Sequence, residues 1–288
     1  MNKKAFLQEV KNVIENKSLG LYVGAGLSMG AGLPSWKELL LALIKIVEDN
    51  ETLAETKIAE LKNLVKYPSK YLMLAEELRE IIPQRLPKFI KEKFDDKNLK
   101  PNKVHEYLLQ VKSNFIITTN YDTLIEKAFV KLYDDVFPTI HTYKNASSIN
   151  YNLWNKDFFI LKAHGDAKNS PNDIVLTEKD YRKIIYNQRG YQSVLHAIFS
   201  THTIVLLGIS LSDPELLLML GYIHNIFHGG SPTHYALVDK NSISNIEIDR
   251  WRKDFNIECI KYDSKDNHIE LENILKEIVD QNGKLELT

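Results

Sequence analysis

Three polar side chains stand directly after short apolar runs, at the places where strands of an α/β sheet would end. Asn120 and Asp122 follow the apolar run at residues 114–118, and His164 follows the run at 158–161. Open α/β sheets bind their ligands outside the carboxyl ends of their strands. A histidine titrates near neutrality and can accept a proton there. The location therefore makes Asn120, Asp122 and His164 the candidate catalytic residues.

Each of these residues also has a purely structural interpretation. Asp122 precedes the helical pattern TLIEKAF and could be only its N-cap, because Asp commonly caps helices. Asn120 could belong to a turn. His164 is one of nine histidines and could lie in a turn as well. His224 and His228 are spaced four apart in a helical pattern, but without the Glu of a zinc protease motif we interpret them as surface or core-edge residues.

A glycine-rich turn follows the apolar run at residues 20–23. Gly24 and Gly26 allow a tight turn and a close approach to a ligand, and the N-terminus of a following helix attracts anions. A P-loop would need Lys followed by Ser or Thr here, and the third glycine of a dehydrogenase fingerprint would fall at Met29. The turn therefore predicts a phosphate site of another kind, or else a tight turn without a ligand.

A second turn of this type occurs later in the chain. Gly208 and Ser210 follow another apolar run and lead to Asp213 and Pro214, which is a typical helix start. We interpret Asp213 as a helix cap. Asp239 ends the next apolar run and would lie at the same edge of the sheet, although any strand end of an α/β protein has a similar appearance.

The elements that must position these residues alternate between strand and helix patterns. Buried-strand patterns occur at residues 20–23, 114–118, 158–161, 203–207, 234–238 and 256–260. Helical patterns occur at residues 36–48, 123–132, 178–186, 191–199, 214–227 and 269–279. This alternation predicts an α/β fold with a doubly wound, mostly parallel, Rossmann-like sheet.

The segment at residues 51–101 shows helical periodicity only. We therefore expect a helical subdomain inserted into an α/β domain that comprises residues 1–50 and 102–288. The stretch KNASSINYN, at residues 144–152, is rich in polar and small residues and is expected to be a surface loop. Residues 1–17 have the pattern of an amphipathic charged helix without a signal-peptide core.

The composition excludes several classes of protein. The chain has 288 residues, of which 44% are hydrophobic and 26% charged, as in an ordinary globular protein. Its formal net charge of −1 gives no global attraction to nucleic acid or to anionic lipid. No apolar run reaches the ~20 residues of a membrane span, so we expect a cytoplasmic protein. Cys259 is the single cysteine, which leaves no internal disulfide and no multi-cysteine zinc site, and no metal is expected.

Three segments together resemble the SIR2-like (sirtuin) family. They are LYVGAGLSMGAGLPSWK at residues 21–37, ITTNYDTLIEKAF at 117–129 and LKAHGD at 161–166. In the first segment the matching positions are Gly24, Ala25, Gly26, Ser28, Gly32, Pro34, Trp36 and Lys37. The chain departs from the family at Ser35-Trp36-Lys37, where Asp-Phe-Arg is usual, and at Thr119, where Gln is usual. The GxSxxDP segment at 208–214 is similar to a SIR2-like branch found in bacterial antiviral proteins.

The resemblance implies that NAD+ is the substrate and assigns roles to these residues. Asn120 would order the ribose or a water molecule, Asp122 would contact the nicotinamide amide, and His164 would be the base at a ribose hydroxyl. Gly24 to Ser28 would hold the pyrophosphate, the Trp36 loop would close over the nicotinamide side, and the later turns would contact adenosine. The implied binding residues are Gly24, Ala25, Gly26, Ser28, Pro34, Trp36, Thr118, Gly208, Ser210 and Asp239.

The resemblance implies an NAD+ glycohydrolase of antiphage defence, which would release nicotinamide and ADP-ribose or a cyclic form. A protein deacylase is chemically adjacent, but the missing zinc module argues against it. A noncatalytic NAD or ADP-ribose sensor and a structural subunit stay as alternatives, because glycine turns serve binding as well as catalysis. Since a free NADase would kill its own cell, we expect gating by homo-oligomerisation and by a separately encoded sensor or activator. A HerA-type ATPase or a nucleotide-sensing protein would fit this role.

Overall fold

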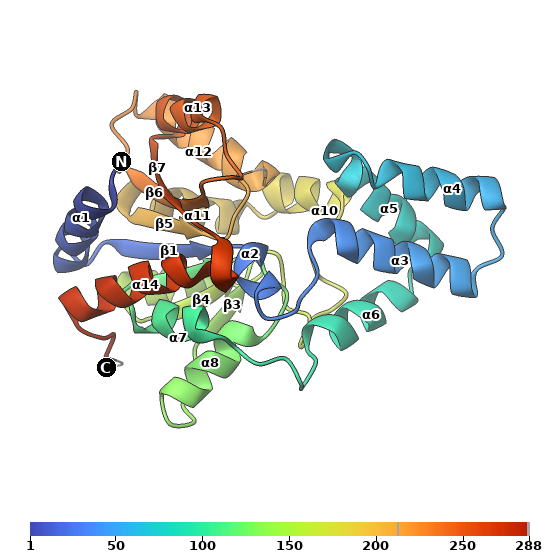
Figure 1. The fold of residues 1–288 in the computed structure, drawn as a ribbon, viewed down its shortest axis with the longest axis horizontal. Coiled ribbons are helices and arrows are strands. Elements are labelled where there is room, and N and C mark those ends of the chain that lie inside the picture. The colour runs from blue at the N-terminus through green and yellow to red at the C-terminus, as the bar shows by residue number, and fades with distance from the viewer. Residues whose placement is uncertain (212, 287–288) are drawn as a thin grey trace.

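The computed structural model describes residues 1–211 and 213–286, which are built around a parallel sheet (Figure 1). Its strands in these ranges are β1 (Leu19–Val23), β2 (Phe115–Thr118), β3 (Ile140–Thr142), β4 (Phe159–Lys162), β5 (Thr203–Leu207), β6 (His234–Asp239) and β7 (Ile257–Tyr262). The order across the sheet is β3-β4-β2-β1-β5-β6-β7, and every neighbouring pair is parallel. The predicted doubly wound α/β fold is therefore confirmed.

The winding direction of the sheet changes at β1. This strand pairs with β2 on one side, where Val23 lies opposite Thr118, and with β5 on the other, where Val23 lies opposite Leu207. The chain passes from β1 to β2 and from β5 to β6, and these two steps run in opposite directions across the sheet. Such a switch point is where open α/β sheets bind ligands. The turns that carry Gly24 and Gly208 follow these two strands.

Helices cover both faces of the sheet, and successive strand residues point to opposite faces. Leu21 and Val23 belong to the core on the first face, and Tyr22 belongs to the core on the second. The first face is covered by α1 (Lys3–Glu15), α7 (Lys103–Gln110), α8 (Leu124–Leu132) and α14 (Lys265–Asn282). The second is covered by α9 (Ala146–Asn155), α11 (Arg189–Thr201), α12 (Pro214–Ile226) and α13 (Asn245–Phe255). Burial on both sides explains the continuous apolar runs of the central strands.

A helical layer projects to the right of the sheet in Figure 1. It consists of α3 (Trp36–Asn50), α4 (Glu55–Leu64), the short 3-10 turn η1 (Pro68–Lys70), α5 (Tyr71–Ile81) and α6 (Arg85–Phe94). These helices share one apolar core, to which Leu124, Ile174 and Leu176 of the α/β part also belong. The layer thus includes α3, although the predicted helical subdomain begins at residue 51, and the division into domains stays a prediction. In the described ranges no helix has the length and apolarity needed to cross a membrane.

Some elements differ from the prediction for identifiable reasons. The expected loop at residues 144–152 is wrong, because α9 begins at Ala146; this helix fully buries only Ile149, so its apolar periodicity is weak. The short edge strand β3 and the helix α13, which has no fully buried residue, also lack a strong apolar pattern. The helix that follows the glycine turn, α2 (Ala25–Met29), has only five residues. A predicted helix at 178–186 is divided into α10 (Glu178–Arg182) and the π-helical turn η2 (Lys183–Asn187).

Candidate active site

The turn after β2 is held in place by Thr118. Its hydroxyl donates a hydrogen bond to the carbonyl oxygen of Val23 on β1 (3.0 Å) and accepts one from the backbone N–H of Asn120 (3.1 Å). The side-chain amide of Asn120 then donates to the carbonyl oxygen of Gly24 (3.2 Å) and to the hydroxyl of Ser28 (2.8 Å). Thr118, predicted as a binding residue, therefore positions Asn120 against the glycine turn.

Ser28 joins Asn120 to Asp122. The Ser28 hydroxyl donates to Oδ2 of Asp122 (2.7 Å), and Oδ1 of Asp122 accepts from the backbone N–H of Leu124 at the start of α8 (2.9 Å). Asp122 thus does interact with the helix N-terminus, as the structural interpretation expected, and it also belongs to a side-chain cluster with Ser28 and Asn120. All three side chains are buried.

The amide oxygen of Asn120 is an orphan within this cluster. Asn120 is only 7% exposed, and its Oδ1 atom is buried without a hydrogen-bond partner. An unpaired buried acceptor costs free energy and calls for an explanation such as a bound water molecule or ligand. Asn120 therefore offers an acceptor at the carboxyl edge of the sheet, beside the switch point.

A buried lysine lies beneath the same turn. Lys162, the last residue of β4, is fully buried and donates to the carbonyl oxygen of Asp122 (2.6 Å), Glu126 (2.7 Å) and Asp166 (3.2 Å). Burial by itself lowers the pKa of Lys162, but the charges of Glu126 and Asp166 raise it above its ordinary value. Lys162 therefore stays charged and ties the turns after β2 and β4 together.

His164 lies in the turn after β4, where its carbonyl oxygen accepts from the backbone N–H of Val175 (2.9 Å). Gly165 has φ +92°, and a Cβ atom there would lie 2.9 Å from the carbonyl oxygen of Asp173, so this turn requires glycine. Nε2 of His164 lies 3.3 Å from Oδ2 of Asp213 and 3.9 Å from Oε2 of Glu215. His164 is therefore held in a second cluster, separate from the hydrogen-bonded set around Asn120.

The second cluster is formed mainly by the N-terminus of α12. Oδ1 of Asp213 accepts from the backbone N–H of Leu216 (2.9 Å), which confirms Asp213 as the cap of this helix. Its Oδ2 accepts from the hydroxyl of Tyr181 (2.8 Å). Gln192 donates to Oε1 of Glu215 (2.5 Å). The cap residue thus also faces the candidate base.

Burial dominates the electrostatics of this cluster. It lowers the pKa of His164, and the negative charges of Asp213 and Asp180 raise that pKa only in part. Burial and the charge of Asp213 raise the pKa of Glu215 to about 8. At neutral pH Glu215 is therefore largely protonated, His164 is neutral, and Asp213 supplies the negative charge next to the imidazole.

The two glycine turns at the switch point pack directly against each other. A Cβ atom on Gly24 would lie 2.6 Å from the carbonyl oxygen of Gly208, and one on Gly26 would lie 2.9 Å from the Cα atom of Gly208. The N–H of Gly26 donates to that same carbonyl oxygen (2.9 Å). The glycines are thus required by backbone packing, and the N–H of Gly26 already has a partner. The phosphate-binding role of this turn stays a prediction.

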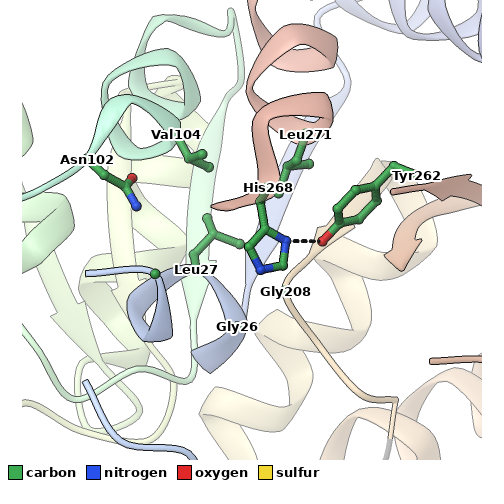
Figure 2. Close-up of a pocket in the computed structure, with 9 residues that line it drawn as sticks. Gly26, Leu27, Asn102, Val104, Gly208, Tyr262, His268 and Leu271 are labelled. Atoms are coloured by element: carbon green, nitrogen blue, oxygen red, sulfur yellow. Dashed lines mark hydrogen bonds between the residues drawn. The ribbon is translucent and has the colours of Figure 1, made fainter. Parts of the chain in front are cut away.

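A small pocket opens beside both turns (Figure 2). It is lined by Gly26, Leu27, Gly30, Asn102, Val104, Gly208, Tyr262, His268 and Leu271. Figure 2 shows the imidazole of His268 between Leu27 and Tyr262, and the hydroxyl of Tyr262 lies 3.0 Å from Nδ1 of His268. The pocket therefore joins the glycine turns to the end of β7 and the first turns of α14.

The remaining predicted binding residues lie outside the two clusters. Ala25 begins α2, and Ser210 lies between β5 and α12. Pro34 precedes α3, and the ring of Trp36 packs on Tyr71 in the helical layer, with 6.1 Å between ring centroids. Asp239 ends β6 and closes the following turn by accepting from the N–H of Asn241 (3.3 Å).

Four residues near these clusters were not singled out as site residues by the sequence. They are Lys162, Tyr181, Glu215 and, in its contact with His164, Asp213. A lysine inside the apolar run FFILKA and an acidic pair at a helix start were the available signals. Neither signal identifies its partner, because the partners come from distant parts of the chain.

Comparison with known proteins places this fold and site in a family. A family model described as the SIR2-like domain matches residues 114–260, which include Asn120, Asp122, His164 and Asp213. This match covers half of the chain, and the chain belongs to the SIR2-like domain family. The resemblance inferred from the motifs is confirmed.

Several curated relatives are similar to this chain over more than three quarters of its length. NAD(+) hydrolase ThsA of Enterococcus faecium is 29% identical over 245 residues, covering 83% of this chain and 47% of the relative. NAD(+) hydrolase ThsA of Cytobacillus dafuensis is 25% identical over 283 residues, covering 97% of this chain and 53% of the relative. Defense-associated sirtuin 2 of Bacillus subtilis is 26% identical over 238 residues, covering 78% of this chain and 22% of the relative. The chain spans about half the length of the ThsA proteins.

Proposed function

We propose that this chain is an NAD+ glycohydrolase of antiphage defence, which cleaves the bond between nicotinamide and ribose. The products would be nicotinamide and ADP-ribose, or a cyclic form. The observation that carries the proposal is the buried cluster of Ser28, Asn120 and Asp122, in which Asn120 keeps an unpaired acceptor at the carboxyl edge of the sheet. Support also comes from relatives that are named NAD(+) hydrolases and from one named a defense-associated sirtuin.

The scissile bond joins a cationic nicotinamide to C1′ of the ribose, so its cleavage develops positive charge on the sugar. Catalysis requires that this charge be stabilised and that a nucleophile be held in place. The amide oxygen of Asn120 would accept from a water molecule or a ribose hydroxyl. A carboxylate can accept about four hydrogen bonds, so Asp122, which accepts from Ser28 and Leu124, retains capacity for the nicotinamide amide.

His164 would act as the base in this scheme. The C1′–N bond breaks and its electron pair leaves with nicotinamide, while the oxygen of water or of a ribose hydroxyl bonds to C1′. The proton released by that oxygen passes to the imidazole of His164. Burial keeps His164 neutral at physiological pH, so it is ready to accept this proton.

The pocket beside the glycine turns would receive the adenosine end of NAD+. Gly26 and Gly208 line it, and both belong to the turns that the resemblance assigns to the pyrophosphate and the adenosine ribose. Gly24, the N-cap of α2, and Ser28, within α2, accept hydrogen bonds from the side-chain amide of Asn120. A dinucleotide lying across α2 would thus connect the pocket with the Asn120 cluster.

We also propose that a partner gates the activity. Uncontrolled NAD+ cleavage would kill the producing cell, so homo-oligomerisation and a separately encoded sensor or activator, such as a HerA-type ATPase or a nucleotide-sensing protein, would restrain it. Leu218, Tyr222 and Ile226 form a half-exposed apolar stripe on α12, which supports contact with a second copy. Light scattering during turnover tests this idea, and full activity of an isolated monomer would exclude it.

The experiment that tests the enzymatic function is NAD+ turnover with chromatographic separation of the products. We expect nicotinamide release by the wild-type protein, alone or with a candidate activator, and a loss of at least ~100-fold in His164→Ala and Asn120→Ala. His202→Ala, just before β5 and therefore at the amino edge of the sheet, is the matched control and should retain activity. Tight NAD+ binding without release under every condition would support a sensor, and activity that survives both substitutions would refute the mechanism.

A further inference from the structure

The two carboxylate oxygens of Asp213 have different partners. Oδ1 accepts from the backbone N–H of Leu216 and so caps α12, as an aspartate at an N-cap position commonly does. Oδ2 points elsewhere: it accepts from Tyr181 (2.8 Å) and lies 3.3 Å from Nε2 of His164. Helix capping accounts for the first oxygen only, so the second calls for a separate explanation.

Tyr181 fixes this second oxygen and the imidazole at the same time. Its hydroxyl has a single proton, which it donates to Asp213, and its ring meets the His164 ring edge-to-face, with 5.3 Å between centroids and 83° between planes. Tyr181 and His164 are both buried, and the Asp213 side chain is 18% exposed. Tyr181 of α10 and Asp213, the cap of α12, therefore contact the imidazole from elements other than the turn that carries His164.

We propose that Asp213 is a positioning residue for His164. The carboxylate of Asp213 orients the imidazole and balances the charge that the ring gains when it accepts a proton. This inference rests on the proposed function, in which His164 is the base. In the ligand-free protein Nε2 lies 3.3 Å from Oδ2 of Asp213 without a hydrogen bond, so the carboxylate acts on the imidazole through its charge. When Nε2 carries the ring proton, the other ring nitrogen is unprotonated and can take the proton of the attacking hydroxyl. The proton that His164 accepts stays on the imidazole.

The charged and titratable groups that face His164 favour Asp213 as its counterion. Glu215, also on α12, is largely protonated at neutral pH because burial and Asp213 raise its pKa to about 8. The charge of Asp180, on α10, raises the pKa of His164 less than the charge of Asp213 does, and the Asp180 carboxylate is paired with Arg79 (2.7 Å). Tyr181 is neutral, since burial raises its pKa well above the ordinary value. Asp213 is thus the negative charge in contact with the ring.

The test is the titration of His164 in the ligand-free protein, followed by NMR of labelled histidines and assigned with His164→Asn. Asp213→Asn keeps a capping side chain and removes the charge, so we expect the His164 pKa to fall by about one unit. Asp213→Ser should give the same fall, and Asp213→Glu should return the pKa toward the wild-type value. Ser244→Ala removes the cap of the neighbouring α13 and is the control: it should lower Tm without moving the His164 pKa.

The pH dependence of kcat/KM for NAD+ cleavage is the second readout. In Asp213→Asn the acidic limb of the pH profile should move to lower pH by the same amount as the NMR pKa of His164, and the plateau should fall about tenfold. The shift of the limb is diagnostic, because a loss of the helix cap alone would not move it. An unchanged His164 pKa in folded Asp213→Asn and Asp213→Ser would overturn the inference. A shifted NMR pKa in a protein whose wild type never cleaves NAD+ would support the pairing and refute the proposed function.

Discussion

Lys162 is the residue whose removal should affect the site most through stability. Its ammonium is fully buried and neutralises Glu126 and Asp166 while it holds the carbonyl oxygen of Asp122. Lys162→Met would leave two carboxylates without their counterion, and breaking a buried pair in this way costs about 3–5 kcal/mol. We expect that loss in the free energy of unfolding, measured with urea at pH 7.

The matched control for Lys162 is Lys131, whose ammonium lies 2.7 Å from Glu106 at the surface. Lys131→Met should cost no more than about 1 kcal/mol, because exposed ion pairs contribute little. If both substitutions cost the same small amount, Lys162 does not hold the turn in the way described here.

The sequence could place the candidate residues at the ends of buried strands but could not identify their partners. Asn120, Asp122 and His164 could be predicted because each follows a buried strand, and parallel strands bring their carboxyl ends to one edge. Asn120 is hydrogen-bonded to Ser28, and His164 lies 3.3 Å from Asp213; both partners come from other turns of the chain. No local pattern encodes such long-range contacts.

The two glycine turns at the switch point should act as one structural element. A Cβ atom on Gly24 would lie 2.6 Å from the carbonyl oxygen of Gly208, so Gly24→Ala must push the two turns apart. We expect a loss of about 1–3 kcal/mol in the free energy of unfolding and a loss of NAD+ cleavage, since Asn120 contacts this turn. Urea unfolding and the turnover assay measure the two effects.

Gly221 provides the matched substitution within α12. A Cβ atom there would make an ordinary contact of 3.5 Å with the ring of Phe255, and the residue lies in a helix interior. Gly221→Ala should therefore stabilise the protein by about 0.5–1 kcal/mol, through the higher helix propensity of alanine. A stabilising Gly24→Ala would show that the turns are not in close contact.

At the level of elements, strong apolar patterns were found and weak ones were missed. The central strands β1, β2, β4, β5 and β6 are buried on both faces, so their sequences are continuous apolar runs. The edge strand β3 has three residues, and α9 fully buries one side chain. Such elements are specified by their contacts with the rest of the sheet, which a single segment of sequence does not contain.

For the whole molecule, buried neutral histidines should make stability depend on pH. His234 accepts from the backbone N–H of Ile204 (3.2 Å), and burial lowers its pKa from 6.5 to about 4. Between these two values the unfolded chain binds a proton that the folded protein does not. The free energy of unfolding should therefore decrease as the pH falls from about 7 to about 4, and His234 alone should contribute about 2–3 kcal/mol to this decrease.

The contribution of His234 can be isolated by substitution. His234→Asn retains an acceptor for Ile204 and cannot be protonated, so its unfolding free energy should fall less between pH 7 and pH 4.5, as measured with urea. Glu215 acts in the opposite direction, because its raised pKa favours the folded state at low pH, but it is present in both proteins and cancels in the comparison. His228→Asn is the control, since His228 is exposed with φ +48°, a conformation that Asn tolerates. Equal pH dependence in wild type and His234→Asn would mean that the pKa of His234 is the same in the folded and unfolded protein. The loss of stability in acid would then originate elsewhere in the molecule.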